Sequence, residues 1–585
     1  MKKVLGIILS IMLVLSFATV VLAASVQDGT YVVETKGMYN GLKLSVTFTN
    51  GKITEVKVLE HQETAGISDL PIAKIPAEIV ANNSVNIDTI AGATRTSAGI
   101  LDGVKQAILL AGGNIDDFMG KTTDLREKAV VELETDVVVA GAGMAGLTAA
   151  LSAAEHGYDV ILLEKMPVTG GSLAVAGGGF ITVNSPVYAR LAPNSPKDTL
   201  EDALTAFTTI SQLGGYVSDK YPNVEKVKKH FAEFGATHEW LEKQGVVFSR
   251  ATAPNPGKSL GMLIAQGGGL GVAQALTSTI QANDRIDLYL STPATKLIAE
   301  NGKVTGVIAE SDSTIYHIKA NYVILATGGF ASNPDMIAEL VPAYVGTVNT
   351  AAAGSTGDGI RMAVEVGAKM YDEHWMVTAF ASPTQAFLDI NRQASSLQFA
   401  NRVLVNEAGK RFVNEADSFT LVTNAIACSD TKTYAIFDST NERFVPILET
   451  GLDGGNVFKG NTIEELAKNA GIDSKGLVET IMNYNQYAAA GNDPEFNKAA
   501  ASLVGYADEG PYYAVEYRPS VWGSMSGVVT DEYYRVLNTE GSVIEGLYAI
   551  GEVSNKEFYN HNYQGGASLS FYSTMGRLVG GYLGK

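Results

Sequence analysis

The chain has 585 residues, of which 46% are hydrophobic and 18% charged, a composition typical of a globular protein with three or four domains. Its formal charge of −19, without a basic tract, argues against nucleic acid as a partner. The single cysteine, Cys428, excludes an intrachain disulfide, a cysteine-held iron–sulfur cluster and CxxCH haem attachment, so electron transfer would require organic cofactors.

Residues 1–24 have the pattern of a secretory signal peptide. Two lysines precede an uncharged apolar run from Val4 to Ala24 that ends in small residues, with cleavage expected near Ala23 or Ala24. The run is also just long enough to span a bilayer, so an uncleaved anchor is the alternative. Both interpretations predict an extracytoplasmic protein, either secreted or membrane-anchored.

A first domain is expected over residues 25–120. Residues 42–60 alternate apolar and polar side chains around Asn50-Gly51, which predicts a hairpin. Residues 99–113 predict an amphipathic helix closed by glycine. The stretch DTIAGATRTSAG, residues 88–99, is expected on the loop before that helix. A charged stretch, residues 121–134, is interpreted as a linker.

A dinucleotide-binding fold is expected to follow the linker. The apolar strand 136–140 leads into a GxGxxG pattern, then a helix, then a second strand that ends at Glu164. This context makes the motif specific, because the glycines let the backbone approach a pyrophosphate at the helix N-terminus and the acid can bind ribose hydroxyls. The glycines concerned are Gly141, Gly143 and Gly146.

Later segments return to the same fold. A hairpin is predicted around Asn301-Gly302, a buried strand over 321–330 ends in paired glycines, and GLYAIGEV, residues 546–553, is a further strand. The dinucleotide-binding domain is therefore predicted from 135–360 and 506–585. Residues 361–505 are predicted to be an inserted cap domain.

These motifs resemble the fumarate reductase/flavocytochrome c family of flavoproteins. The matching stretches are GAGMAG, LLEK, TGGS at 169–172, ATGGF, TGDG, GKRFVNE at 409–415 and AIGE. The resemblance implies an α/β fold: a Rossmann-like FAD-binding domain with an inserted α+β cap, preceded by a small α+β domain. It also implies FAD contacts from Gly141, Gly143, Gly146, Glu164, Gly171, Ser172, Gly328, Asp358 and Glu552.

The stretch at 88–99 resembles the FMN-binding domain motif D-x-x-S-G-A-T-x-T, with Ala91 in place of the serine, and HQETAG at 61–66 matches the same domain. The resemblance implies that a flavin transferase links FMN to Thr96 through a phosphoester, while Thr94 shapes the site. The alternative is an ordinary helix N-cap, a position that suits Ser or Thr. FMN would accept electrons from a membrane or extracellular donor, as in urocanate reductases and related extracytoplasmic respiratory reductases.

Three positions depart from the family pattern. Phe419, Trp522 and Tyr563 stand where fumarate-type enzymes carry arginines or histidines. An aromatic pocket suits a larger and less charged substrate than a dicarboxylate. The position of Tyr563 is also similar to that of a tyrosine in ketosteroid dehydrogenases. The sequence therefore predicts reduction of the activated C=C bond of an enone or aromatic enoate, with Tyr563 and a backbone N–H near Gly566 polarising the carbonyl.

Several alternatives stay open at this point. Candidate proton donors are Asp417, His374, Tyr371 and His561. An unsaturated-acid reductase would require Arg392, Arg402 or Arg518 to rebuild the carboxylate clamp. A non-catalytic flavin electron carrier is the third possibility. No metal site is predicted.

Overall fold

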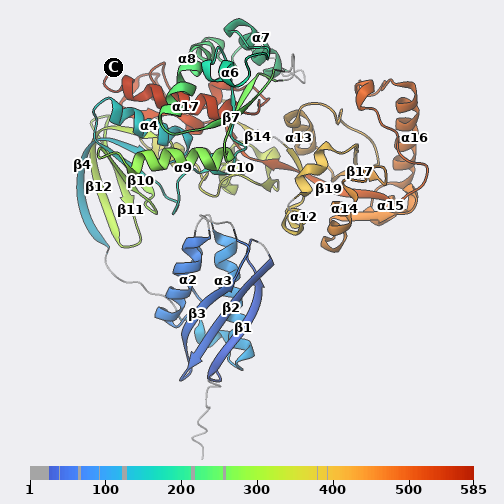
Figure 1. The fold of residues 1–585 in the computed structure, drawn as a ribbon, viewed down its shortest axis with the longest axis horizontal. Helices are drawn as coiled ribbons and strands as arrows, with labels where there is room; N and C mark the ends of the chain where they lie inside the picture. Colours follow the sequence, from blue (N-terminus) through green and yellow to red (C-terminus); the bar gives the residue numbers. More distant parts are fainter. Residues whose placement is uncertain are drawn as a thin grey trace, which may run out of the picture. The chain divides into compact units, whose positions relative to one another are not determined.

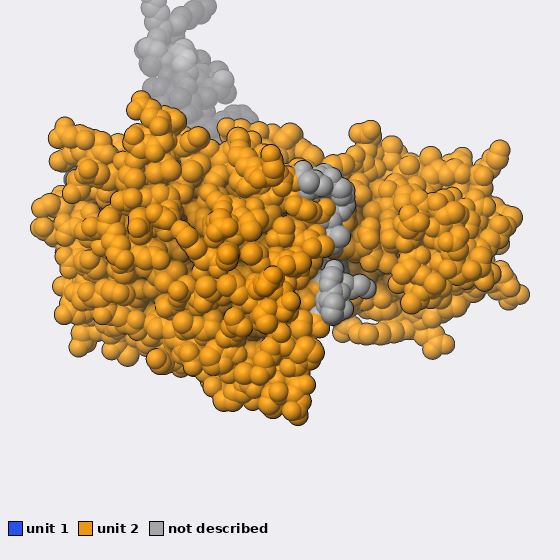
Figure 2. Space-filling model, turned by 90° about the horizontal axis from the view of Figure 1, so that it is seen from above, with its two compact units in different colours: residues 1–125 blue, residues 126–585 orange. Residues whose placement is uncertain are grey.

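The computed structural model describes residues 26–38, 40–63, 68–90, 93–120, 128–212, 218–254, 259–378, 380–391 and 393–585. The chain divides into two compact units, residues 1–125 and 126–585. The second unit, orange in Figure 2, has a larger and a smaller lobe. No helix within these described ranges is both long and apolar enough to cross a membrane. The predicted signal segment lies outside them.

The first unit is a three-stranded antiparallel sheet covered by helices (Figure 1). Its elements are β1 (Gly29–Lys36), β2 (Asn40–Thr49), β3 (Lys52–Glu60), α2 (Asp69–Asn82) and α3 (Thr94–Leu110). The predicted hairpin is confirmed, since β2 pairs with β3 across Asn50 and Gly51, both at positive φ. Helix α3 begins at Thr94, so Thr94 and Thr96 lie in its first turn rather than on the preceding loop.

The second unit is built on an eight-stranded sheet, with main order β10-β11-β22-β12-β4-β5-β9 and β21 beside β22. The strands are β4 (Ala129–Ala140), β5 (Val160–Leu163), β9 (Ile286–Tyr289), β10 (Ala294–Glu300), β11 (Lys303–Glu310), β12 (Thr314–Leu325), β21 (Arg535–Leu537) and β22 (Val543–Ala549). Strand β12 runs parallel to both β4 and β22, so distant segments of the chain share one sheet. The hairpin at Asn301-Gly302 is confirmed by β10 and β11.

Strand β4 corrects the predicted linker. Residues 129–134, assigned to the linker because of their charges, pair with residues 314–319 of β12. Their side chains alternate between exposed and half-buried, so a two-residue period carries the charges on the solvent face of a strand. A high density of charges is typical of linkers, but in this segment it belongs to a strand with one solvent-exposed face.

Helices cover this sheet and extend the larger lobe. Helix α4 (Met144–Glu155) follows β4 and packs against α17 (Ala567–Val579). All residues of α4 from Met144 to Ala154 are buried, which suits its Ala-rich sequence. The other helices and strands of this part are α5 (Ser172–Val175), β6 (Gly179–Ile181), α6 (Pro186–Leu191), α7 (Leu200–Ser211), α8 (Val224–Lys243), β7 (Phe248–Thr252), β8 (Met262–Ala265), α9 (Gly268–Gln281), α10 (Pro334–Leu340), α11 (Asp358–Glu365), β14 (Trp375–Val377) and β20 (Gly523–Met525).

A second sheet organises the inserted region. Its order is β13-β19-β17-β16, with β15 and β18 also paired to β19. Its strands and helices are β13 (Val348–Asn349), β15 (Phe380–Pro383), α12 (Gln385–Ile390), β16 (Val403–Asn406), α13 (Phe419–Ala427), β17 (Thr433–Asp438), α14 (Val445–Gly451), β18 (Val457–Gly460), α15 (Ile463–Ala470), α16 (Ser474–Ala490) and β19 (Tyr512–Val521). Residues 512–521, which the sequence assigned to the dinucleotide-binding domain, are therefore the central strand of the cap sheet. Sequence position alone did not reveal their partners.

Candidate functional site

The glycine motif forms a tight turn between β4 and α4. Gly141 has φ +102°, and a Cβ built there would lie 2.5 Å from the Ala326 carbonyl oxygen. A Cβ on Gly146 would lie 1.8 Å from the Gly141 carbonyl oxygen. Gly143 is the N-cap of α4, and a Cβ there would meet nothing closer than 3.8 Å. The motif therefore combines two packing glycines with one that leaves open space at the helix N-terminus.

Glu164, directly after β5, lies beside this turn and is 6% exposed. Its carboxylate accepts hydrogen bonds from the backbone N–H groups of Ala142 and Met166, both at 2.8 Å. Burial raises the pKa of the carboxyl, and these two hydrogen bonds oppose the rise. A buried carboxylate is thus fixed at the carboxyl edge of the sheet, where open α/β folds bind nucleotides.

A second buried carboxylate belongs to Glu552, which follows β22. It accepts hydrogen bonds from the Ser524 N–H at 2.6 Å and from the Ser524 hydroxyl at 3.0 Å. Burial is the main cause that raises its pKa to about 7. Asp358, at the start of α11, is half-exposed and pairs with Lys165 at 2.7 Å. These acids come from segments almost 400 residues apart in the chain.

One cavity of about 730 Å³ brings these segments together. The predicted residues that line it are Gly141, Gly143, Glu164, Gly171, Ser172, Gly328, Asp358, Trp522, Glu552, Tyr563 and Gly566. Gly146 is absent from this lining because it packs α4 onto the turn. Phe419 begins α13, and its side chain lies outside the described part, but Thr420, the next residue, does line the cavity.

Tyr563 lies at the N-terminus of α17, whose N-cap is Gly566. Burial raises the pKa of its phenol, while hydrogen bonds from Ser568 and from the Gly566 backbone lower it. The hydroxyl therefore stays protonated at neutral pH and lies against the positive end of the helix. The sequence did not single out Tyr572 or Ser568, which also line the cavity. Their spacing of four residues, on one face of α17, is the signal that could have found them.

In the first unit, Thr96 is buried and its hydroxyl donates a hydrogen bond to the Glu63 carboxylate. The same carboxylate accepts a hydrogen bond from the Met38 backbone N–H at 3.0 Å. Glu63 is 8% exposed, and a Cβ on Gly37 would lie 2.8 Å from its carboxylate oxygen. Three separate segments, at residues 37–38, 63 and 96, thus meet at the Glu63 carboxylate. Thr94 is the first residue of α3, and Ala91 lies outside the described residues.

Comparison with known proteins identifies both units. Residues 136–569 match the FAD binding domain, and residues 37–109 match the FMN-binding domain. Urocanate reductase from Eggerthella lenta is 32% identical over 92% of this chain and 89% of its own. The chain belongs to the fumarate/urocanate reductase family of FAD-binding flavoproteins. It is an oxidoreductase of the kind that acts on CH–CH groups, and it carries an N-terminal FMN-binding domain.

Other relatives of the family differ in length and in their named substrates. NADH:acrylate oxidoreductase from Vibrio harveyi is 30% identical over 94% of this chain, which spans only 61% of that relative. Vinyl phenol reductase from Lactiplantibacillus plantarum is 30% identical over 71% of this chain and 89% of its own. A solved flavocytochrome c3 fumarate reductase, in its open conformation, has a TM-score of 0.61 and 26% identity over 77% of this chain and 78% of that one.

The described lining of the cavity differs from what a dicarboxylate-reducing family member would be expected to use. It contains no arginine or histidine, and its lysine, Lys165, pairs with Asp358. Arg518 is half-exposed and pairs with Glu516 at 3.0 Å, whereas Arg402 lines a different cavity. Arg392 lies outside the described residues. The described part of the chain therefore offers no rebuilt arginine clamp in the larger cavity.

None of the four proposed proton donors is among the residues described as lining this cavity. Asp417 lines the other cavity. The His374 ring is 2.7 Å from the Ser526 hydroxyl, and burial lowers its pKa. His561 packs on Trp375 with ring centroids 4.0 Å apart. Tyr371 is fully buried, and burial raises its pKa well above the usual range. The proton donor is not assigned to any of them.

Proposed function

We propose that the protein reduces the activated C=C bond of an α,β-unsaturated carbonyl compound, an enone or an aromatic enoate, with bound FAD supplying the hydride. The observation that carries this proposal is the cavity of about 730 Å³, in which Tyr563 and Trp522 stand among mostly uncharged lining residues. A cavity with this lining suits a flat, weakly charged substrate. The relative named vinyl phenol reductase supports the same choice.

The residues present fit FAD. Gly143 leaves room for a pyrophosphate at the N-terminus of α4, and Gly141 lets the turn pass close to the Ala326 backbone. The carboxylates of Glu164 and Glu552 accept hydrogen bonds from backbone N–H groups at two places in the cavity. Asp358, the first residue of α11, pairs with Lys165. We propose that these three carboxylates bind hydroxyl groups of FAD and that Gly171, Ser172 and Gly328 line its path.

Tyr563 is proposed to donate a hydrogen bond to the substrate carbonyl oxygen. Its raised pKa keeps the phenol protonated, and a hydrogen bond from the Gly566 backbone to the phenol holds it at the start of α17. Negative charge that develops on the carbonyl oxygen would then meet the phenol, polarised by the Gly566 N–H, and the helix dipole. Trp522, 38% exposed, and the neighbouring Gly523 are proposed to shape the space for the substrate body. Phe419 is proposed to complete that wall.

We further propose that FMN is attached to Thr96 by a phosphoester and that electrons enter there. The hydroxyl already donates a hydrogen bond to Glu63, a buried carboxylate suited to accept its proton as the phosphoester forms. A flavin transferase would perform the attachment with a flavin dinucleotide as donor: the bond from the Thr96 oxygen to the flavin phosphate forms, the pyrophosphate bond breaks, and the adenosine monophosphate leaves. The N-terminal segment supports an extracytoplasmic location, with the electron donor in the membrane or outside the cell.

An unsaturated-acid reductase is the second candidate function, and the relatives named for acrylate and urocanate favour it. The two are separated by anaerobic oxidation of the viologen-reduced holoenzyme with enones, cinnamates, urocanate and fumarate. We expect enones or cinnamates to reoxidise the flavin fastest. Rapid turnover of fumarate would contradict the proposed substrate class. Reoxidation by none of these acceptors would favour an electron carrier.

A further inference from the structure

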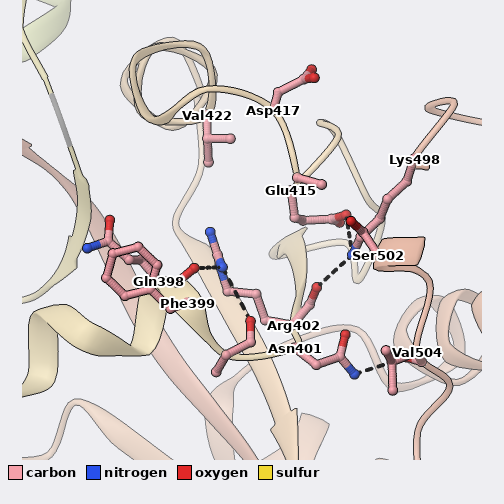
Figure 3. A pocket seen from close by; sticks show the side chains of 12 residues that line it. Gln398, Phe399, Asn401, Arg402, Glu415, Asp417, Val422, Lys498, Ser502 and Val504 are labelled. Carbon is pink, nitrogen blue, oxygen red and sulfur yellow. Dashed lines mark hydrogen bonds and ion pairs between the residues drawn. The ribbon is translucent and has the colours of Figure 1, made fainter. Parts of the chain in front are cut away.

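A second cavity, of about 380 Å³, lies wholly within the inserted cap (Figure 3). It shares no described lining residue with the larger cavity. Its polar lining comes mainly from Gln398, Arg402, Asp417 and Lys498, and its apolar lining includes Val422 and Val504. It is therefore a separate polar site rather than an extension of the flavin cavity.

Arg402 is the unusual residue of this cavity, because it is 92% buried and has no counter-ion among the described residues. Its Nη1 group donates to the carbonyl oxygens of Gln398 and Ala400, the latter at 3.4 Å. Its Nε group is buried and finds no hydrogen-bond acceptor in the part of the chain that is described. A buried guanidinium with an unused donor is costly unless an acceptor fills the site.

The nearby acids do not neutralise Arg402. Glu415 is shared between Arg411, at 3.0 Å, and Lys498, at 3.3 Å. The Lys498 ammonium also donates to the Arg402 carbonyl oxygen, at 3.3 Å. The Asp417 side chain points away from the Arg402 guanidinium in Figure 3. The Glu415 charge is thus already compensated, whereas Arg402 forms no ion pair with the described residues that line the cavity.

The geometry sets the chemistry of the ligand. Two backbone carbonyls hold the Nη1 side of the guanidinium, which leaves the edge with Nε for a planar acceptor, and a carboxylate matches that edge with two parallel hydrogen bonds. The Gln398 side-chain oxygen is also buried without a partner among the described residues, so it requires a donor. The volume and the valines leave room for a short carbon chain.

We propose that this cavity binds a small hydroxycarboxylate, with the carboxylate on Arg402 and the hydroxyl on Gln398. Such a ligand carries an acceptor for the Arg402 Nε group and a donor for the Gln398 side-chain oxygen. Asp417, which also lines the cavity, disfavours ligands with more than one negative charge. Binding here does not depend on the reaction proposed for the larger cavity.

The test is calorimetric titration of the full-length holoenzyme with lactate, propionate and lactamide at constant ionic strength. We expect saturable binding of lactate, at least threefold weaker binding of propionate, and no binding of the uncharged lactamide. Arg402→Met should weaken lactate binding at least tenfold. The matched control, Arg518→Met, removes an exposed arginine outside the cavity and should bind lactate as the wild type does.

Two further variants test whether a loss of binding reflects misfolding and whether lactate binds in the larger cavity instead. Gln398→Leu should bind lactate and propionate with equal affinity, because only the hydroxyl contact is lost. Tyr563→Phe, a change in the larger cavity, should bind lactate as the wild type does. Unchanged binding would show that lactate does not bind at Tyr563 in the larger cavity. Equal binding of lactamide, unchanged binding in Arg402→Met, or binding of inorganic phosphate in preference to lactate would each overturn the proposal.

Discussion

At the scale of single residues, burial favours the protonated form of two side chains in the larger cavity. The Tyr563 phenol and the Glu552 carboxyl both have raised pKa values, because the charged form of each loses hydration inside the protein. The first is thereby kept as a hydrogen-bond donor. The second is placed close to half-protonation at neutral pH, where a small change in its surroundings alters its charge.

Tyr563→Phe should lower kcat for the true substrate about 10²–10³-fold, the usual cost of removing one donor from a developing oxyanion. The bound flavin spectrum should stay unchanged. Stopped-flow reoxidation of the reduced enzyme measures the effect. Tyr559→Phe is the matched control, since that hydroxyl lies 3.1 Å from the Ser568 hydroxyl and the residue does not line the cavity. Equal losses in both variants would show a structural rather than a catalytic effect.

Glu552 should make the stability of the FAD-free protein depend on pH. A carboxyl with a raised folded-state pKa takes up protons on folding, so its contribution to the free energy of unfolding falls as the pH rises from 4.5 through about 7. That rise in pKa corresponds to about 3 kcal/mol. Urea unfolding at pH 5 and pH 8 should show a larger loss in the wild type than in Glu552→Gln. An equal loss in both proteins would exclude the assigned pKa.

At the scale of elements, local patterns predicted more than distant ones. The hairpins at Asn50-Gly51 and Asn301-Gly302, like the strand–glycine–helix unit, depend on neighbours in sequence, and all three are present. The pairing of Thr96 with Glu63 joins residues 33 positions apart, and the partners of β19 lie up to 172 positions away. No periodicity in the sequence encodes such pairs, so the carboxylate partner of Thr96 and the place of β19 in the cap sheet become apparent only in the folded chain.

The first turn of α3 should carry the covalent flavin. In cells that also express a flavin transferase, intact-mass spectrometry should show one FMN on the wild type and on Thr94→Ala, and none on Thr96→Ala. Glu63→Gln keeps the shape of the side chain but weakens proton acceptance, so attachment should slow at least tenfold. Full attachment in Glu63→Gln would limit Glu63 to a structural role, and attachment to Thr96→Ala would place the flavin elsewhere.

The turn between β4 and α4 should separate packing from cofactor binding. Gly146→Ala places a Cβ in steric conflict with the Gly141 carbonyl oxygen, which should lower the free energy of unfolding by about 1–3 kcal/mol. Gly143→Ala has room within the protein and should leave the stability of the FAD-free protein unchanged, while FAD affinity falls because the new methyl group enters the cavity. Thermal unfolding and flavin titration distinguish the two. Similar instability in both variants would contradict this division.

At the scale of the whole molecule, each unit has its own hydrophobic core. The FAD fold and the family were within reach of the sequence, because ordered motifs span about 410 residues, from Gly141 to Glu552. Two features of the site could not be predicted. The four proton-donor candidates are not among the described residues that line the larger cavity, and Arg402 lines a different cavity. Both depend on how the cap segments pack, which the motifs do not specify.

A chain without residues 1–125 should therefore fold and bind FAD. It should keep viologen-driven turnover within about twofold of the full chain and lose turnover with the physiological donor, because only the entry flavin is removed. Flavin content and both activities measure this. Loss of FAD or of viologen-driven turnover would show that the first unit supports the second rather than merely supplying it with electrons.

The order of the sheet also bears on how the protein is made. Strand β22 pairs with β12, and the Ser152 hydroxyl on α4 donates to the Arg577 carbonyl oxygen on α17, 425 residues later. The glycine turn leaves the ribosome early, but its helix lacks α17, its most extensive packing partner, until residues 567–579 follow. Glu552 likewise arrives some 390 residues after Glu164. The proposed FAD site is therefore complete only after most of the chain has been synthesised, and until then the growing chain would have to avoid aggregation without its cofactor.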